Sequence, residues 1–425
     1  MKKTEYARLG ETVWRETCEN GLRLIVVPKH GFSKRYAFFA TQYGSMDMRF
    51  SIDGARKETP AGVAHYLEHK MFDTREGNAL QELAKLGAEP NAFTSDDITG
   101  YYFESTEHFE ESLRILLSFV SVPYFTEESV AKEQGIIGQE IRMIEDDPNW
   151  RVYANLLQGL YANHPARIPV AGTVESIARI TAQTLYDCHR AFYDPSNMAL
   201  CVVGDVDPGR IRDIAREILP ESAGLSVERD YGAEEGETAA APAVEMAMPV
   251  SQPLFLCGYK GPAARGGEEE MRQELVGNMA CDILFGETSG LYNRLYAEGL
   301  INSVFGGGYD LLPGASFVAV GGESESPRKV HLAIVEEAER IAREGVGEAL
   351  WRQTRRATYG SFLRGLNSFE NIAVAMAERT FRGCDYFRFP EIFDTITKQD
   401  VERFIADYVT PDRATISIIH PKAES

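Results

Sequence analysis

The stretch ITAQTLYDCHRAFYDPSNMALCVV, residues 180–203, returns 216 positions later as ITKQDVERFIADYVTPDRATISII, residues 396–419. Both copies open with Ile-Thr, carry a Gln at the fourth position and place a Pro fifteen residues after the Ile. Each copy predicts a helix, a short turn and an apolar strand. Such elements recur by chance in α/β chains, but a match without gaps in four identities and in pattern indicates a duplication. The sequence therefore predicts two copies of one α/β domain.

Hydrophobic periodicity and turn residues give the same mixture of elements elsewhere in the first half. We expect an α/β (α+β) fold of two homologous domains, each a mostly antiparallel sheet packed by helices. The first two strands are expected to form a hairpin-like pair. The predicted strands are residues 22–27, 35–43, 101–105 and 198–203, and the predicted helices are residues 60–72, 77–86, 109–120 and 127–144.

The segment ESAGLSVERDYGAEEGETAAAP, residues 221–242, is polar, acidic and rich in Ala and Gly. This composition is typical of a linker between domains. We therefore expect an N-terminal domain at residues 1–220, an acidic linker at 221–243 and a C-terminal domain at 244–425.

Composition excludes several classes of protein. The 44 basic and 64 acidic residues give a formal net charge of −20, which argues against nucleic acid as the main partner because phosphates need clustered Lys and Arg. The sequence contains no run of about 18 apolar residues, so no membrane span is predicted. The first twenty residues lack the pattern of a signal or transit peptide, so we expect a cytoplasmic protein. The six cysteines include no CxxC pair and are expected to be buried thiols.

The sharpest chemical feature is AHYLEH, residues 64–69. On a helix, His65 and His69 lie one turn apart on one face, where two imidazoles can share a zinc ion. Glu68 lies on a neighbouring part of that face and can take a proton from a water on the metal. This spacing is the H-x-x-E-H motif of a class of zinc peptidases. The alternative is two helix histidines that meet by accident.

A catalytic zinc ion usually has three protein ligands and an open position, so a third ligand is expected further along the chain. The predicted helix at 127–144 offers Glu133 and Glu140, which are two turns apart and so lie on one face. Their spacing alone does not say which of them would bind the metal, and a solvated acidic face would look the same.

These motifs together resemble the pitrilysin-type (M16) metallopeptidases, a family that includes insulin-degrading enzyme and the mitochondrial processing peptidase. The resemblance is carried by HYLEH, by the E-x6-E pair, by GAEPNAFTSDDITGYYF at residues 87–103 and by HPARIPVAGTVESI at 164–177. It extends over essentially the whole chain, whose length suits the short bacterial members with two domains.

The resemblance implies a role for each matching residue. His65, His69 and Glu140 would be the zinc ligands, Glu68 the general base, and Glu133 a catalytic carboxylate that supports the site by holding a histidine ring. The resemblance also implies that Asn91, Ala92 and Phe93 lie on an edge strand that accepts the peptide substrate as an added β-strand.

The second half departs from the family pattern in two ways. It has no HxxEH, since the equivalent helix reads approximately NMACD at residues 278–282. It also lacks, in the stretch 295–303, the Arg and Tyr seven residues apart that many members use to hold the substrate and its oxyanion. A partner chain could supply the pair, Arg294 and Tyr309 could substitute loosely, or turnover would be poor. The resemblance thus implies a homodimer, or a heterodimer with a metal-free M16 sister chain.

Two functions from different classes follow. The first is a zinc endopeptidase that hydrolyses short or unfolded peptides inside the two-halved chamber typical of the family. The second is a non-catalytic or weakly active subunit for assembly or peptide binding. The intact HxxEH and both glutamates favour the enzyme. A processing peptidase with one dedicated substrate would have the same sequence features.

Overall fold

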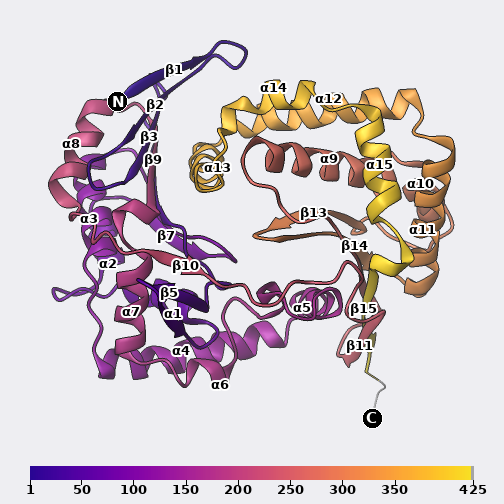
Figure 1. Ribbon diagram of the computed structural model, residues 1–425, viewed down its shortest axis with the longest axis horizontal. Coiled ribbons are helices and arrows are strands. Elements are labelled where there is room, and N and C mark those ends of the chain that lie inside the picture. The colour runs from indigo at the N-terminus through magenta and orange to yellow at the C-terminus, as the bar shows by residue number, and fades with distance from the viewer. Residues whose placement is uncertain (423–425) are drawn as a thin grey trace. The chain divides into compact units, whose positions relative to one another are not determined.

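The computed structural model describes residues 1–422, which divide into two compact units (Figure 1). Each unit combines a β-sheet with helices, so the predicted α/β class is confirmed. Unit 1 consists of Met1–Ile141, Pro169–Tyr231 and Leu363–Arg388, and unit 2 of Arg142–Ile168, Gly232–Phe362 and the described residues from Phe389 onward.

The units are not continuous along the chain. The first half of the sequence gives residues 142–168 to unit 2, and the second half gives residues 363–388 to unit 1. The compact units therefore differ from the contiguous ranges 1–220 and 244–425. As a division of the sequence into two repeats, those ranges remain a prediction.

Unit 1 is built on a seven-stranded sheet of order β1-β2-β3-β9-β4-β8-β7. Only the pair β3–β9 is parallel, so the sheet is mostly antiparallel, as the sequence predicts. Unit 1 also contains a small three-stranded sheet of order β10-β5-β6. The strands are β1 Lys2–Tyr6, β2 Glu11–Thr17, β3 Arg23–Pro28, β4 Arg35–Thr41, β5 Arg49–Ile52, β6 Ala55–Glu58, β7 Glu89–Thr94, β8 Thr99–Ser105, β9 Met198–Gly204 and β10 Val227–Arg229.

The expected hairpin of β3 and β4 is wrong, because β9 pairs between them. The long connection from β4 to β9 allows a later strand to insert at the centre of the sheet. The helices of unit 1, with most of α4, are α1 Val63–Met71, α2 Ala79–Lys85, α3 Phe109–Ser121, α4 Glu127–Glu145, α6 Val174–Ile177, α7 Ala182–Phe192, α8 Pro208–Ile218 and α13 Phe369–Phe381, and the 3-10 turns are η2 Pro195–Asn197 and η3 Tyr386–Arg388.

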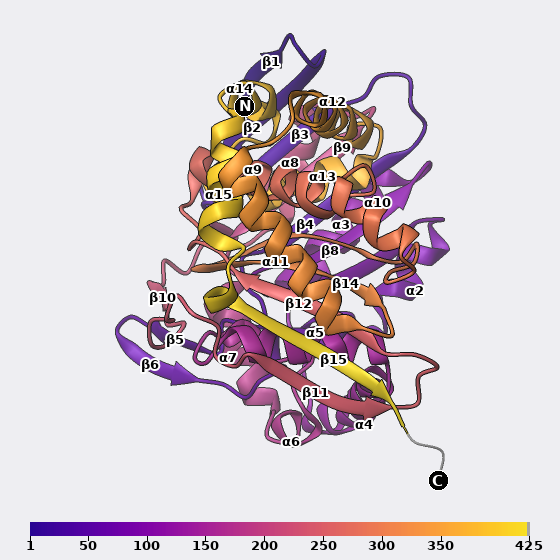
Figure 2. The ribbon, with the colours of Figure 1, turned by 90° about the vertical axis from the view of Figure 1, so that its right-hand side faces the viewer.

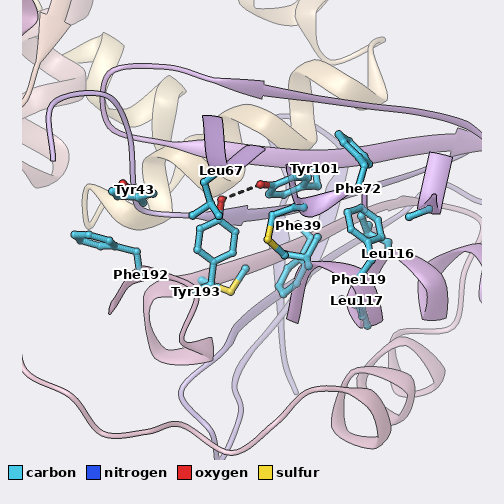
Figure 3. Close-up of a cluster of buried hydrophobic side chains, with 14 of the residues drawn as sticks. Phe39, Tyr43, Leu67, Phe72, Tyr101, Leu116, Leu117, Phe119, Phe192 and Tyr193 are labelled. Atoms are coloured by element: carbon cyan, nitrogen blue, oxygen red, sulfur yellow. Dashed lines mark hydrogen bonds between the residues drawn. The ribbon is translucent and has the colours of Figure 1, made fainter. Parts of the chain in front are cut away.

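Alternation along the strands buries both faces of this sheet. Phe39 and Tyr101 face a core that also contains Leu67 of α1 and Phe192 of α7 (Figure 3). The hydroxyls of Tyr101 and Tyr193 are hydrogen-bonded at 2.8 Å within this core, which removes the cost of burying them unpaired. The intervening residues, such as Phe38, point to the opposite face, where α13 packs on β4 and β9.

Unit 2 repeats this arrangement on a five-stranded sheet of order β11-β15-β12-β14-β13 (Figure 2). Its one parallel pair is β11–β15. The strands are β11 Ala243–Met248, β12 Leu254–Lys260, β13 Gly306–Leu312, β14 Ala315–Glu323 and β15 Ala414–Pro421, and the helices are α5 Pro148–Leu160, α9 Gly267–Phe285, α10 Gly290–Ala297, α11 Pro327–Glu344, α12 Glu348–Gly365, α14 Phe389–Asp394 and α15 Lys398–Tyr408, with 3-10 turns η1 Pro165–Arg167 and η4 Pro411–Arg413.

The internal repeat of the sequence is visible in both units. The first copy forms α7, η2 and β9, and the second forms α15, η4 and β15. Each sheet also packs a helix from the other half of the sequence. Helix α13 lies on β9 and β4 in unit 1, and α5 lies on β15 and β12 in unit 2. This exchange explains why the compact units are discontinuous.

The acidic segment 221–243 makes specific contacts instead of running free. Within unit 1 it contains β10, which pairs with β5. Within unit 2, Glu235 accepts hydrogen bonds from the backbone N–H of His164 and from the buried Lys260. No helix in the described part of the chain is long and apolar enough to cross a membrane. All six cysteines are buried and free, as expected.

Candidate metal centre

Helix α1 begins where a glycine allows the backbone to turn sharply. Gly62 has φ 92°, in the left-handed region, and a Cβ there would come within 2.4 Å of the carbonyl oxygen of Ala171. The predicted helix 60–72 therefore starts later, at Val63. Ser176 donates to the carbonyl oxygen of Ala61 at 2.8 Å. The segment 164–177, singled out in the sequence, thus contributes residues that brace the start of α1.

The two histidines of α1 meet a glutamate of α4. His65 Nε2 lies 3.6 Å from Glu140 Oε1, and His69 Nε2 lies 3.6 Å from Glu140 Oε2. The imidazole ring centroids are 4.6 Å apart. One donor atom from each of these three residues lies within 4.8 Å of the other two. The structure therefore brings together the three residues that the sequence analysis assigned as metal ligands.

This donor set fits zinc. Ligand atoms about 2.1 Å from a tetrahedral zinc ion are separated by about 3.4 Å, close to the two separations of 3.6 Å at Glu140. These separations are too long for hydrogen bonds, so Glu140 and the two imidazoles do not satisfy one another directly. Two imidazoles and one carboxylate form a ligand set typical of catalytic zinc sites.

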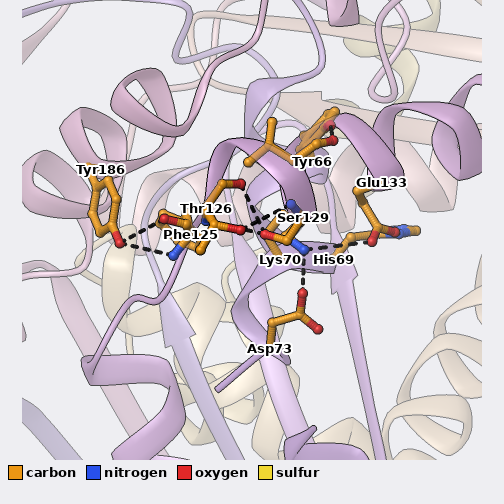
Figure 4. A network of polar contacts seen from close by, with 10 residues as sticks. Tyr66, His69, Lys70, Asp73, Phe125, Thr126, Ser129, Glu133 and Tyr186 are labelled. Atoms are coloured by element: carbon orange, nitrogen blue, oxygen red, sulfur yellow. Dashed lines mark hydrogen bonds and ion pairs between the residues drawn. The ribbon is translucent and has the colours of Figure 1, made fainter. Parts of the chain in front are cut away.

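Glu133 occupies the position expected of a supporting carboxylate. Its Oε1 lies 3.2 Å from His69 Nδ1, the ring nitrogen on the side away from Glu140 (Figure 4). This contact leaves His69 Nε2 as the nitrogen that faces Glu140. The hydrogen bond to His69 is the main reason that the pKa of Glu133 is lowered. Carboxylates in this position fix the tautomer and orientation of a ligating histidine.

The two histidines differ electrostatically. Burial, followed by the neighbouring charge of His69, lowers the pKa of His65 to about 4, so this ring stays neutral at physiological pH. Burial acts in the same direction on His69, but the hydrogen bond to Glu133 and the nearby carboxylates outweigh it and raise the pKa of His69. Within the described residues, His65 Nδ1 is buried without a hydrogen-bond partner.

Glu68 points from α1 toward the edge strand β7. Its side chain is buried, and its Oε2 accepts a hydrogen bond of 2.7 Å from the Thr94 hydroxyl. Burial raises the pKa of Glu68, and the Thr94 hydrogen bond opposes that shift. Thr94 directly follows the predicted substrate residues 91–93, and its contact with Glu68 was not predicted from the sequence.

The predicted substrate residues lie on an edge strand. β7 is the last strand of its sheet, and within residues 1–422 it pairs with β8 alone. Asn91 Oδ1 accepts from the Ala92 N–H at 2.9 Å, and the Phe93 ring stacks on Phe38 at 5.8 Å. The loose substitution of Tyr309 for the missing Tyr is wrong, because Tyr309 is buried and its hydroxyl contacts Ser316 and Gln273.

Comparison with known proteins shows the family to which the chain belongs. The model of the insulinase family, peptidase family M16, matches residues 51–174, and the model of the peptidase M16 inactive domain matches residues 179–358. The Bacillus subtilis protein named uncharacterized zinc protease YmfH is 39% identical over 433 residues, and the alignment covers all of both chains. The chain belongs to peptidase family M16.

Solved structures agree with this assignment. An M16-like peptidase from Alicyclobacillus acidocaldarius matches with a TM-score of 0.94 at 33% identity, over 97% of this chain and 99% of that one. Pitrilysin shares the fold alone, with a TM-score of 0.77 at 14% identity, over 99% of this chain and 46% of that one. The predicted short, two-domain M16 architecture is therefore confirmed.

Proposed function

We propose that this chain is a zinc-dependent endopeptidase that hydrolyses short or unfolded peptides. The observation that carries the proposal is the convergence of His65, His69 and Glu140, with Glu68 on the same helix. A zinc peptidase needs three protein ligands and a carboxylate that can move a proton beside them. Relatives named zinc proteases support the same reading.

The roles divide between metal binding and orientation. His65 and His69 would hold the ion through Nε2, and Glu140 through a carboxylate oxygen. Glu133 would hold His69 in the required tautomer. Zinc bound there would supply Lewis-acid polarisation of the scissile carbonyl and of the attacking water.

Glu68 would move the proton of the reaction. Its carboxylate accepts a proton from the water as the new C–O bond forms at the carbonyl carbon. It then delivers that proton to the amide nitrogen as the C–N bond breaks, so the carboxylate is regenerated. Thr94 engages Oε2 at 2.7 Å, which leaves Oε1 as the oxygen that handles the proton.

The edge strand would present the peptide to these groups. An extended peptide can pair with β7 along Asn91, Ala92 and Phe93, and backbone pairing reads little side-chain sequence. Only a chain that can adopt an extended conformation can bind in this way, which favours short or unfolded substrates. The two-halved chamber known from the family would add exclusion by size.

We further propose that the active species is a dimer. Neither residue seven positions from Arg294 is a tyrosine, since these are Glu287 and Ile301, and Tyr309 is buried. Developing charge on the carbonyl oxygen needs a donor. A second copy of the chain, or a metal-free M16 sister chain, would supply it. The expected cytoplasmic location remains a prediction.

The alternative is a subunit that binds peptides or supports assembly without cleaving them. The site geometry disfavours it, since such a subunit needs neither a buried Glu68 beside the histidines nor Glu133 on His69. A processing peptidase with one substrate would use the same residues, and only its cleavage specificity would distinguish it.

The test is Glu68→Gln in the full chain, measured by zinc content and by cleavage of a quenched peptide library. We expect one zinc per chain to be retained and kcat to fall by about 10²–10⁴, because the amide cannot accept the proton. Glu128→Gln is the matched control, since Glu128 is exposed on α4. Near-normal turnover by Glu68→Gln would exclude this role for Glu68.

A further inference from the structure

Lys70 is a buried cation beside the candidate metal centre. It follows His69 in the last turn of α1, and only 1% of its surface is exposed. Its Nζ pairs with Asp73 and lies 3.9 Å from Glu133 Oε2 (Figure 4). Burying an ammonium group costs several kcal/mol unless carboxylates lie near it, and Asp73 and Glu133 are the carboxylates that face Lys70.

Glu133 is shared between this cation and the metal site. Its Oε1 lies 3.2 Å from His69 Nδ1, and its Oε2 faces Lys70. Two ion pairs and one hydrogen bond thus link four side chains in order: Asp73, Lys70, Glu133 and His69. The row ends at the imidazole whose Nε2 approaches Glu140.

We propose that Lys70 is a positioning residue of the metal centre, which acts by fixing the Glu133 carboxylate that in turn holds the His69 ring. The inference rests on the proposed function, since it assigns Lys70 a role only if His69 binds zinc. With both oxygens engaged, Glu133 keeps one orientation, so the His69 ring is preorganised before the metal arrives.

Two other roles for Lys70 lead to different results. A lysine at a helix C-terminus can simply neutralise the helix dipole and pair with Asp73 three residues later. In that case, zinc affinity would not depend on it. If Lys70 acted mainly by its positive charge near a dication, removing it would strengthen zinc binding. Positioning through Glu133 predicts weaker binding on removal.

The experiment is a double-mutant cycle on the zinc dissociation constant, measured by chelator competition at pH 7.5 on the full chain. The variants are Lys70→Met, Glu133→Gln and the two combined. We expect Glu133→Gln to weaken zinc binding by about 10–100-fold and Lys70→Met by about 3–10-fold. In the Glu133→Gln background, Lys70→Met should add less than about twofold, because its effect passes through the missing carboxylate.

Asp73→Asn is the matched control, since it removes the other partner of Lys70 and should change the zinc dissociation constant by less than about twofold. If Lys70→Met fails to fold, Lys70→Gln serves in the same cycle. Wild-type affinity in the Lys70 variant, tighter binding, or an equal loss in both backgrounds would overturn the inference while leaving the zinc site intact. A wild-type chain that binds no zinc at His65 would overturn the proposed function itself.

Discussion

The two sheets share one topology, but within the described residues only unit 1 contains a candidate metal site. Strands β3-β9-β4-β8-β7 of unit 1 correspond in order and direction to β11-β15-β12-β14-β13 of unit 2. In each unit a helix packs on the last strand, α1 on β7 and α9 on β13. Only α1 carries the H-x-x-E-H motif.

The two units differ in the side chains that lie between this helix and the edge strand. In unit 1 it is polar, since Thr94 of β7 donates to Glu68 of α1. In unit 2 the ring of Tyr309 packs against Gly277 of α9, and the Tyr309 N–H donates to Asn278 Oδ1. The same scaffold accepts a carboxylate or a ring at this contact. The fold therefore permits the chemistry without requiring it.

The largest expected effect is the loss of bound zinc when a histidine is replaced in unit 1 but not in unit 2. His65→Ala removes one of three donors and should reduce zinc from about one per chain to none. His331→Ala, which alters a histidine of α11 in unit 2, should retain the metal. Zinc content after gel filtration measures both. If His331→Ala lost zinc and His65→Ala retained it, the zinc site would lie in unit 2, and the assignment to unit 1 would be wrong.

A second change tests the packing of unit 2. A Cβ on Gly277 would meet the Tyr309 ring at 2.2 Å, and that ring is held by the Ser316 and Gln273 contacts. We expect Gly277→Ala to lower the free energy of unfolding by about 1–3 kcal/mol in urea denaturation and to leave zinc affinity unchanged.

Gly360→Ala is the control for that variant. Gly360 lies in α12 with no atom within 4 Å of an added Cβ, so alanine should stabilise the helix by about 0.5–1 kcal/mol. Equal stability of the two variants would contradict the tight contact at Tyr309.

A third change targets the polar contact of unit 1. Thr94→Val keeps the branched shape but leaves Glu68 Oε2 without its hydrogen bond. We expect kcat to fall by about 10–100-fold, with zinc affinity unaltered, because a hydrogen bond to a charged group contributes about 1.5–3 kcal/mol. Thr94→Ser retains the hydroxyl and should restore most of kcat. Serine and valine variants of equal activity would show that the hydroxyl has no part in the reaction.

Much of this arrangement could be predicted from the sequence. The spacing of His65 and His69 fixes their common face on a helix, and the gap-free repeat anticipates the matching of β9 with β15. The pairing of Glu140 with those histidines followed from resemblance, because spacing within α4 could not distinguish it from Glu133.

The rest depends on contacts between distant segments. Strand β9 inserts between β3 and β4 because of tertiary pairing that no local pattern reveals. The exchange of α5 and α13 could not be predicted from amphipathic patterns. Such a pattern shows that one face of a helix is buried, but it does not show which sheet that face packs against. From the sequence alone Lys70 would be placed at the surface, because lysine is rarely buried unless it is paired.

The smallest effect concerns acid stability at one position of the repeat. His189 of α7 corresponds to Ile405 of α15, and both are buried. Burial lowers the pKa of His189 to about 4, below the ordinary value of 6.5. The folded state therefore excludes a proton that the unfolded chain binds below pH 6.5. The stability due to this group is complete above pH 6.5 and is lost as the pH falls toward 4.

Between pH 7.5 and pH 5.5, His189 should account for a loss of about 1 kcal/mol in the free energy of unfolding. His189→Ile copies the residue of unit 2 and should make the pH dependence shallower by that amount. It should also lower stability at pH 7.5, since the contact of His189 Nε2 with the Val120 carbonyl oxygen is lost. Urea titrations of zinc-free protein at both pH values avoid any contribution from metal release. An unchanged pH dependence in the variant would mean that other buried groups, such as His65, cause the acid sensitivity of unit 1.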